Sequence, residues 1–300
     1  NQVNGQPAIN FGNSEEYLQL SPLTNMPDTT LTMVLVLRTS DTNDGIVSYE
    51  TSSSGNELLL FGNALFVSST SSGSFSAIND GNWKIATFTW RSAGGVARLY
   101  RDGNFDQSRT TASGQTLVNN GSFILGEEQD GVFGSGGTLD PAQSFDGDIA
   151  ELVLFNTVLD STERILMENY LSTKYNISIG NDHYALEGTG HQFDLAGVGR
   201  ESATDDHLIG FSDIFGIEAS SFSSDDDYIL YAHNDSLSSF QLNDVPAGIG
   251  TRLRRVWRVD LTGSPGAIDL KFNVAAFGLG TGQAYRVLTD ADGTFSNATI

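Results

Sequence analysis

Hydrophobic and polar positions alternate along short segments of the chain, and a period of two is typical of half-buried β-strands. These segments are rich in Val, Ile, Leu, Phe and Thr, and clusters of Gly, Asn, Ser and Asp separate them. In the first half, the pattern predicts strands over residues 31–37, 57–61, 84–90, 96–101, 122–125 and 149–155. The pair Asp102-Gly103, which follows one of these segments directly, indicates a two-residue hairpin turn.

One segment has the spacing of a helix instead. Asp160 suits an N-cap position and Glu163 follows three residues later, which is the pattern of a capping box. Apolar residues then recur on one helix face at Leu166, Met167, Tyr170 and Leu171. We therefore expect one short helix over residues 160–175.

A polar stretch containing Gly180 follows the helix and predicts a domain boundary near residue 180. Beyond it, strands are predicted over residues 214–219, 228–232, 252–261, 268–274 and 285–289. The predicted fold class is all-β. We expect a two-sheet jelly roll with one short helix over residues 1–180, and a second β-sandwich of about immunoglobulin size over residues 181–300.

Composition narrows the possible functions. The chain has 300 residues, 39% of them hydrophobic, which is enough for a core in each domain. Its 37 acidic and 15 basic residues give a net charge of −22, which disfavours nucleic acid and anionic membranes as partners and favours divalent cations. There is no cysteine, so disulfides and cysteine-type zinc sites are excluded. No apolar run approaches a membrane span.

An acidic stretch without basic residues lies in the middle of the chain. Between Arg109 and Arg164 there is no Lys or Arg, and the middle of this gap contains the carboxylates of Glu127, Glu128, Asp130, Asp140, Asp146, Asp148 and Glu151. Neighbouring carboxylates repel one another unless a cation is present. Calcium suits them, because it takes about six to eight oxygen ligands from carboxylates, amides and backbone carbonyls. A solvated acidic loop is the alternative interpretation.

Three segments occur in the order of motifs found in pentraxins. The stretch FILGEEQDGVFGSGGTLDPAQSFDGDIAELVLF (residues 123–155) resembles the calcium-binding segment of that family. Upstream, TWRSAGGVARLYRDG (89–103) is similar to a pentraxin hairpin, and YETSSSGNELLLF (49–61) is similar to an earlier metal-binding segment. The resemblance covers most of residues 1–175. It implies a concanavalin A-like jelly roll of the pentraxin and laminin-G type that binds Ca²⁺.

The resemblance also implies a role for individual residues. It implies that Glu128 and Asp130 bridge two calcium ions, Gln129 lends its backbone carbonyl, Asp140 and Gln143 hold the second ion, Asn56 holds the first, and Phe61 lines the ligand pocket. Gly55 stands where the family has an aspartate, so the first site lacks a charge and we expect one ion rather than two. The loop between Asp130 and Asp140 is also longer than in the family, which changes how Asp140 is presented.

Such a calcium ion keeps open positions for the phosphate, carboxylate or vicinal hydroxyl groups of a ligand. We therefore expect a calcium-dependent binding module for glycans or anionic ligands. Composition suggests an extracellular or cell-surface location in a bacterial adhesin. Two alternatives stay open: a structural spacer in which calcium only rigidifies loops, and an accessory domain of a polysaccharide-degrading enzyme.

Catalysis is not expected. Glycosidases with a jelly-roll fold carry Glu-x-Asp-x-x-Glu on one strand, whereas the nearest match here begins at Glu128 and Asp130 and ends in Phe133. The second carboxyl group of the acid–base pair is therefore missing. The four histidines, at positions 183, 191, 207 and 233, lie far from the acidic stretch in sequence and have no catalytic motif around them.

The second domain resembles a β-rich module that often follows laminin-G-like domains in bacterial surface proteins. The segments that carry this resemblance are LAGVGRESATDD (195–206), RVWRVDLTG (255–263) and RVLTDADGTFSNAT (286–299). The module usually continues for another hairpin. We therefore expect the chain to be a piece of a longer protein that stops short of the module's end.

Overall fold

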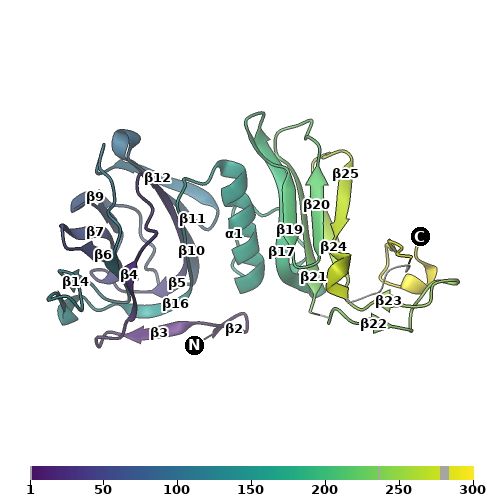
Figure 1. Cartoon of the computed structure of the whole chain (residues 1–300), viewed down its shortest axis with the longest axis horizontal. Coiled ribbons are helices and arrows are strands. Elements are labelled where there is room, and N and C mark those ends of the chain that lie inside the picture. The colour runs from purple at the N-terminus through teal and green to yellow at the C-terminus, as the bar shows by residue number, and fades with distance from the viewer. Residues whose placement is uncertain (1, 236, 278–283) are drawn as a thin grey trace. The chain divides into compact units, whose positions relative to one another are not determined.

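The computed structural model describes residues 2–235, 237–277 and 284–300. The chain divides into two compact units, Asn1–Asp182 and His183–Ile300, each with its own sheets. Figure 1 shows the strands of each unit and α1, the single α-helix in these described ranges, which belongs to the first unit.

The first unit consists mainly of two antiparallel six-stranded sheets. One sheet has the order β12–β11–β10–β5–β16–β3, with the bounds Asn104–Thr110, Val96–Arg101, Lys84–Arg91, Thr30–Thr39, Asp146–Phe155 and Ile9–Gly12. The other has the order β4–β13–β6–β7–β8–β9, with the bounds Leu18–Leu23, Gly121–Leu125, Gly45–Thr51, Ser54–Phe61, Ala64–Val67 and Thr70–Ser74. Neighbours that are distant in sequence, such as β5 and β16, give each sheet the crossovers of a jelly roll.

Shorter elements connect these strands. They are the pair β1 (Gln2–Val3) and β2 (Gln6–Pro7), the pair β14 (Gln129–Asp130) and β15 (Thr138–Leu139), and the 3₁₀ turns η1 (Ala93–Gly95) and η2 (Pro141–Gln143). The pair β14–β15 and η2 belong to the acidic stretch.

The core of this unit lies between the two sheets. Alternate residues of β5, such as Leu35 and Leu37, are fully buried in one cluster with Leu58 and Leu60 of β7. Burying a side chain of this size contributes about 1.5–3 kcal/mol, so the interleaved faces supply much of the unit's stability. The jelly-roll β-sandwich predicted from period-two patterning is confirmed.

Helix α1 (Ser161–Tyr175) has the predicted capping box. Asp160 accepts a hydrogen bond from the backbone amide of Glu163, and the Glu163 carboxylate accepts one from the backbone amide of Asp160. Leu171 and Tyr175 of the helix are buried in one cluster with Val34 and Val36 of β5 and Ile85 of β10. Figure 1 shows α1 beside the sheet that contains these strands. None of the helices in the described ranges is long and apolar enough to cross a membrane.

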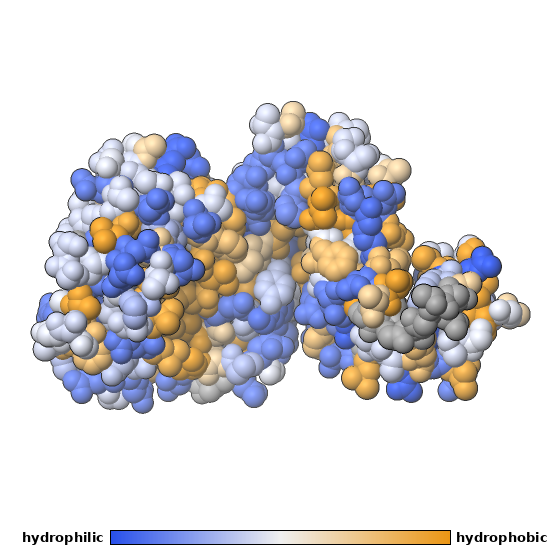
Figure 2. Space-filling view, viewed as in Figure 1, coloured by the Kyte–Doolittle hydropathy of each residue, from blue (hydrophilic) through white to orange (hydrophobic). Residues whose placement is uncertain are grey.

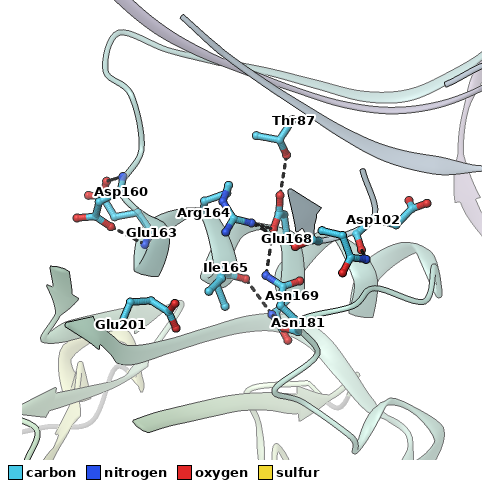
Figure 3. A network of polar contacts seen from close by, with 12 residues as sticks. Thr87, Asp102, Asp160, Glu163, Arg164, Ile165, Glu168, Asn169, Asn181 and Glu201 are labelled. Carbon is cyan, nitrogen blue, oxygen red and sulfur yellow. Dashed lines mark hydrogen bonds and ion pairs between the residues drawn. The ribbon is translucent and has the colours of Figure 1, made fainter. Parts of the chain in front are cut away.

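A buried ion pair within α1 is linked by a hydrogen bond to β10. The Glu168 carboxylate forms a salt bridge with Arg164 and accepts hydrogen bonds from the Thr87 hydroxyl at 2.9 Å and the Asn181 amide at 3.2 Å, as drawn in Figure 3. The Arg164 guanidinium also lies 4.1 Å from the ring centre of Tyr100. Burial raises the pKa of Glu168, and these partners oppose that shift.

The six strands predicted in this unit are all present, within a few residues at their ends. Asp102 and Gly103, with φ of 47° and 79°, form the predicted two-residue turn between β11 and β12. Positive φ at both positions is the geometry that favours Asp-Gly.

The second unit is a smaller β-sandwich. One sheet has the order β18–β17–β21–β24, with the bounds Asp205–His207, His191–Ser202, Asp227–Asn234 and Trp257–Thr262. The other has the order β19–β20–β25, with the bounds Ile209–Ser212, Phe215–Ala219 and Ile268–Phe272. Residues from both sheets, including Val198, Ile217 and Tyr231, share one buried cluster. The predicted second β-sandwich is confirmed.

The remaining elements of this unit are short. They are the pair β22 (Phe240–Gln241) and β23 (Arg252–Leu253), and the 3₁₀ turns η3 (Glu187–Thr189), η4 (Val274–Phe277) and η5 (Phe295–Asn297).

Two strand predictions for the second unit were wrong. Residues 285–289 form no strand and contribute only an isolated bridge between Thr289 and Thr299. The segment 252–261 is divided into β23 and β24. The strand predicted over 268–274 is present as β25, although it ends at Phe272. The longest strand of the unit, β17, was not predicted at all.

Candidate metal centre

The acidic segment leaves the second sheet at a glycine. Strand β13 ends at Leu125, and Gly126 follows with φ of +96°, a conformation that side chains disfavour. A Cβ atom at Gly126 would also lie 2.3 Å from the ring of Phe11. Glycine therefore allows the chain to turn against the core and to present Glu127 and Glu128 beyond the strand.

Gln129 anchors the segment to the sheet. Its side-chain amide donates to the carbonyl oxygens of Ser48 at 3.1 Å and Ser122 at 2.8 Å, and its amide oxygen accepts from the backbone of Phe133 at 3.2 Å. Ser48 pairs across the sheet with Leu59 of β7, and neither residue belongs to the core cluster between the two sheets. Since the side chain is used for anchoring, the backbone carbonyl of Gln129 remains its predicted ligand group.

The hairpin of β14 and β15 brings the distant carboxylates together. The backbone amide of Asp140 donates to the carbonyl oxygen of Glu128 at 3.2 Å. One carboxylate oxygen from each of Glu128, Asp130 and Asp140 lies within 4.8 Å of the other two. The longer loop between Asp130 and Asp140 thus still presents both acids to one place.

Asp140 and Gln143 are held by the 3₁₀ turn η2. One Asp140 oxygen caps the turn by accepting from the backbone amide of Ala142 at 3.0 Å, and the other accepts from the side-chain amide of Gln143 at 2.6 Å. Because the amide nitrogen of Gln143 donates to Asp140, the amide oxygen is the atom that suits a cation.

The charge of Glu128 is poorly compensated. Its side chain is buried, and its Oε2 atom accepts no hydrogen bond. Burial raises the pKa of Glu128 to about 7, and the negative charges of Asp130, Glu50, Asp140 and Glu127 add to the shift. A divalent cation beside this oxygen would offset both the cost of burying the negative charge and the repulsion from the neighbouring carboxylates.

The cluster opens to solvent on one side. Asp130 is exposed and Asp140 is half-buried, whereas Glu128 forms the buried end. The visible surface around β6, β7 and β14 is largely hydrophilic with scattered apolar patches, as Figure 2 shows. A bound ion would therefore keep coordination positions on its solvent side.

Glu127 is a buried carboxylate for which the sequence predicted no role. It accepts a hydrogen bond from the Ser144 hydroxyl, while its Oε2 atom has no hydrogen-bond partner. Burial raises its pKa, and the charges of Glu15 and Asp140 contribute. The residue borders the centre on the side of η2.

Asn56 lies at the start of β7, in a left-handed conformation with φ of 51°. Its Oδ1 atom is buried and accepts no hydrogen bond, so this oxygen is available to a cation. Its backbone amide donates at 2.9 Å to Glu50 of β6, a residue that the sequence analysis missed. The alternation of side chains along β6 is the sequence feature that could have identified Glu50, because it puts Glu50 on the same face as Ser48.

Phe61 is half-buried and lies on the same face of β7 as Leu59, by alternation. It pairs across the sheet with Gly45, where a Cβ atom would lie 2.6 Å from the backbone nitrogen of Glu128. The backbone beside Phe61 therefore approaches the acidic segment. Its role in lining a ligand pocket stays a prediction.

The donor set fits calcium. Carboxylate, amide and carbonyl oxygens are the ligands that a hard cation prefers, and the cluster offers no sulfur or imidazole ligand. Two buried oxygens without hydrogen-bond partners, Glu128 Oε2 and Asn56 Oδ1, belong to predicted ligands. The assignment of the individual ligands stays a prediction.

Several known proteins are similar in sequence to part of this chain. The chain is 40% identical over 85 residues to C-reactive protein 1.1 of Limulus polyphemus, covering 28% of this chain and 34% of that protein. It is 30% identical over 180 residues to mucosal pentraxin of Bos taurus, covering 55% of this chain and 75% of that protein. Against a rat protein with sushi, von Willebrand factor type A, EGF and pentraxin domains, it is 40% identical over 84 residues and spans only 2% of that protein's length.

Among solved structures, a heptameric SAP-like pentraxin from Limulus polyphemus is similar with 18% identity and a TM-score of 0.43, covering 51% of this chain and 77% of that one. Residues 201–300 match a domain of unknown function, DUF8202. Residues 10–183 match the pentaxin family, which is more than half of the chain. Through these residues, the chain belongs to the pentaxin (pentraxin) family.

Proposed function

We propose that this protein is a calcium-dependent recognition module. The observation that carries the proposal is the convergence of Glu128, Asp130 and Asp140 around a buried Glu128 oxygen that accepts no hydrogen bond. Uncompensated carboxylates at such short separations are costly, and calcium is the cation that their oxygens suit.

In this proposal Glu128, Asp130, Asp140 and Gln143 hold the ion. The other predicted ligands are the backbone carbonyl of Gln129 and the side chain of Asn56. All of these groups face the ion from the protein side. Calcium supplies positive charge and open coordination positions on the solvent side. These positions suit the phosphate, carboxylate or vicinal hydroxyl groups of a ligand, and Phe61 adds an apolar wall.

Binding rather than catalysis is proposed because the acid–base pair of a glycosidase is incomplete. Phe133 occupies the position of the missing carboxylate, and its ring packs edge-on against Tyr17, with the ring centres 5.3 Å apart. Hydrolysis by two carboxyl groups would require a second acid there.

We further propose that residues 1–180 form the calcium-binding domain and 181–300 an accessory β-sandwich of an extracellular or cell-surface protein. The relatives named above are animal proteins, so the proposal of a bacterial adhesin rests on composition and on the resemblance of the second domain. The proposed partners are glycans and phosphate- or carboxylate-bearing groups on a cell or matrix surface.

An array of immobilised glycans, glycerol phosphate and carboxylated sugars tests the proposal. We expect retention in millimolar calcium that is lost in EDTA and lost again with Asp140→Asn. Binding to none of these ligands, together with calcium binding to the protein, would favour a calcium-rigidified spacer. Release of reducing ends from soluble polysaccharides would instead identify a hydrolase.

A further inference from the structure

Glu50 is a buried carboxylate beside the predicted metal ligands. It lies in β6, opposite Ser122 of β13, and is 2% exposed. By alternation it shares the face of β6 on which Ser48 accepts a hydrogen bond from the backbone of Gln129 at 3.3 Å. Its side chain therefore points to the side of the sheet that the acidic segment covers.

The Glu50 carboxylate lies beside the position where a side chain is missing. A Cβ atom at Gly55 would be 3.5 Å from Glu50 Oε1, an ordinary contact distance. The same oxygen accepts from the backbone amide of Asn56 at 2.9 Å. Glu50 of β6 thus places a negative charge next to Gly55 of β7, which has no side chain to supply one.

The second oxygen of Glu50 has no comparable partner. Oε2 is buried and accepts no hydrogen bond, although the amide of Gly131 lies near enough to lower the carboxyl pKa. Glu50 is also close enough to Asp130 and Glu128 for their charges to interact with its own. Like Glu50 Oε2, the Asn56 Oδ1 and Glu128 Oε2 atoms are buried and accept no hydrogen bond.

Buried polar oxygens are normally hydrogen-bonded, and a buried carboxylate needs a counter-charge. Arg and Lys supply none here, because the ion pairs in the described part of the chain involve neither Glu50 nor Glu128. A hard cation is the partner that all three oxygens accept.

We propose that Glu50 is a calcium ligand that takes the place of the side chain lacking at Gly55. It completes a position with Asn56, Glu128 and Asp130, separate from the position that Asp140 and Gln143 serve. The centre then binds two calcium ions, where the sequence alone favoured one. This inference rests on the proposed function, since it requires that the acidic cluster binds calcium.

Isothermal titration with calcium chloride, at fixed pH and after removal of metal, tests the inference. We expect two ions for the unaltered chain, one for Glu50→Gln and one for Asp140→Asn. The matched control is Glu57→Gln, because Glu57 is also buried on this hairpin and its carboxylate accepts from the Val118 amide at 2.7 Å. That variant should keep two ions.

A reciprocal exchange separates ligation from a structural role. In the Glu50→Gln background, Gly55→Asp should restore the second ion, because it returns a carboxylate to the same place from β7. In EDTA, Glu50→Gln should raise the melting temperature by removing an unpaired buried charge, whereas in calcium it should reduce the stabilisation by metal. A purely structural glutamate would lower the melting temperature under both conditions.

The possible outcomes are distinct. One ion bound by the unaltered chain, with an unchanged count in Glu50→Gln, would overturn this inference and leave the proposed function intact. No calcium bound by any variant would overturn both. Two ions bound by Glu50→Gln with unchanged affinity would show that Glu50 is not a ligand.

Discussion

Glu128 combines deep burial with four neighbouring negative charges. Its carboxyl pKa is raised from 4.5 to about 7, first by burial and then by Asp130, Glu50, Asp140 and Glu127. Between these two pH values the folded protein keeps a proton that the unfolded chain has released. Without calcium, the free energy of unfolding therefore falls as the pH rises through this range.

This sign gives a prediction for the calcium-free protein. In EDTA the first unit should be more stable at pH 5 than at pH 8, by on the order of 1.4 kcal/mol per unit of pKa shift. Glu128→Gln should flatten that dependence, whereas Asp146→Asn, which removes an exposed carboxylate of β16, should preserve it. Urea unfolding at a series of pH values measures the slope. Stability that rises toward pH 8 in EDTA would contradict the assignment.

Calcium and the Glu128 proton compete for the same carboxylate. The apparent calcium affinity should therefore fall as the pH drops below about 7, approaching tenfold per pH unit. Titration calorimetry in two buffers of different ionisation enthalpy should detect proton release on binding at pH 6.5. Equal heats in both buffers, with an affinity independent of pH, would mean that Glu128 does not ligate the ion.

Asp130 is the exposed member of the cluster and is predicted to be shared by both ions. Asp130→Asn should weaken calcium binding strongly and reduce stabilisation by metal, with little effect in EDTA because the residue is not buried. Asp146→Asn serves again as the control for the loss of one negative charge. Melting curves with and without calcium measure the difference between the two variants.

At the scale of elements, local sequence was sufficient wherever local chemistry decides the conformation. The capping box of α1 and the Asp-Gly turn after β11 were predictable because the residues themselves make or permit the geometry. Strand β17 was missed because Gly197 and Gly199 weaken its β pattern. Cβ atoms there would lie 2.6 Å from the Ile229 carbonyl oxygen and 2.2 Å from the Tyr228 ring, a packing requirement that only the folded structure reveals.

The strand predicted over residues 285–289 is absent for the opposite reason. The segment has the alternation of a strand, but β20 pairs with β19 and β25 instead, and this segment contributes only the bridge at Thr289. Strand pairing is a tertiary property, so a favourable pattern does not by itself supply a partner.

The buried ion pair within α1 yields a prediction on stability. Arg164→Met should destabilise the first unit by about 3–5 kcal/mol, because it leaves the Glu168 charge buried without its cation. Adding Glu168→Gln should recover part of that loss, since a neutral amide needs no counter-charge. Arg91→Met, at the exposed end of β10, is the control and should change little. A loss for Arg164→Met no greater than for the control would contradict the role seen in Figure 3.

At the scale of the whole molecule, the candidate centre joins segments that are distant in sequence. Asn56 and Glu50 come from the β6–β7 hairpin, whereas Glu128 and Asp140 come from the segment after β13. Sequence motifs identified Glu128, Asp130 and Asp140, and the structure brings these three together. Glu50 could not be identified in this way, because its relevance depends on pairing between β6, β7 and β13 rather than on a motif.

The central claim is that calcium binds this centre and is linked to the folding of the first unit. Differential scanning calorimetry with excess calcium and with EDTA tests it most directly. A free calcium concentration one hundredfold above Kd should stabilise the unit by about 2.7 kcal/mol. The melting transition of the first unit should move upward, while that of the second should stay in place, because the clustered carboxylates lie within residues 1–182. A transition of the first unit that does not move at millimolar calcium, with no heat of binding, would contradict the account.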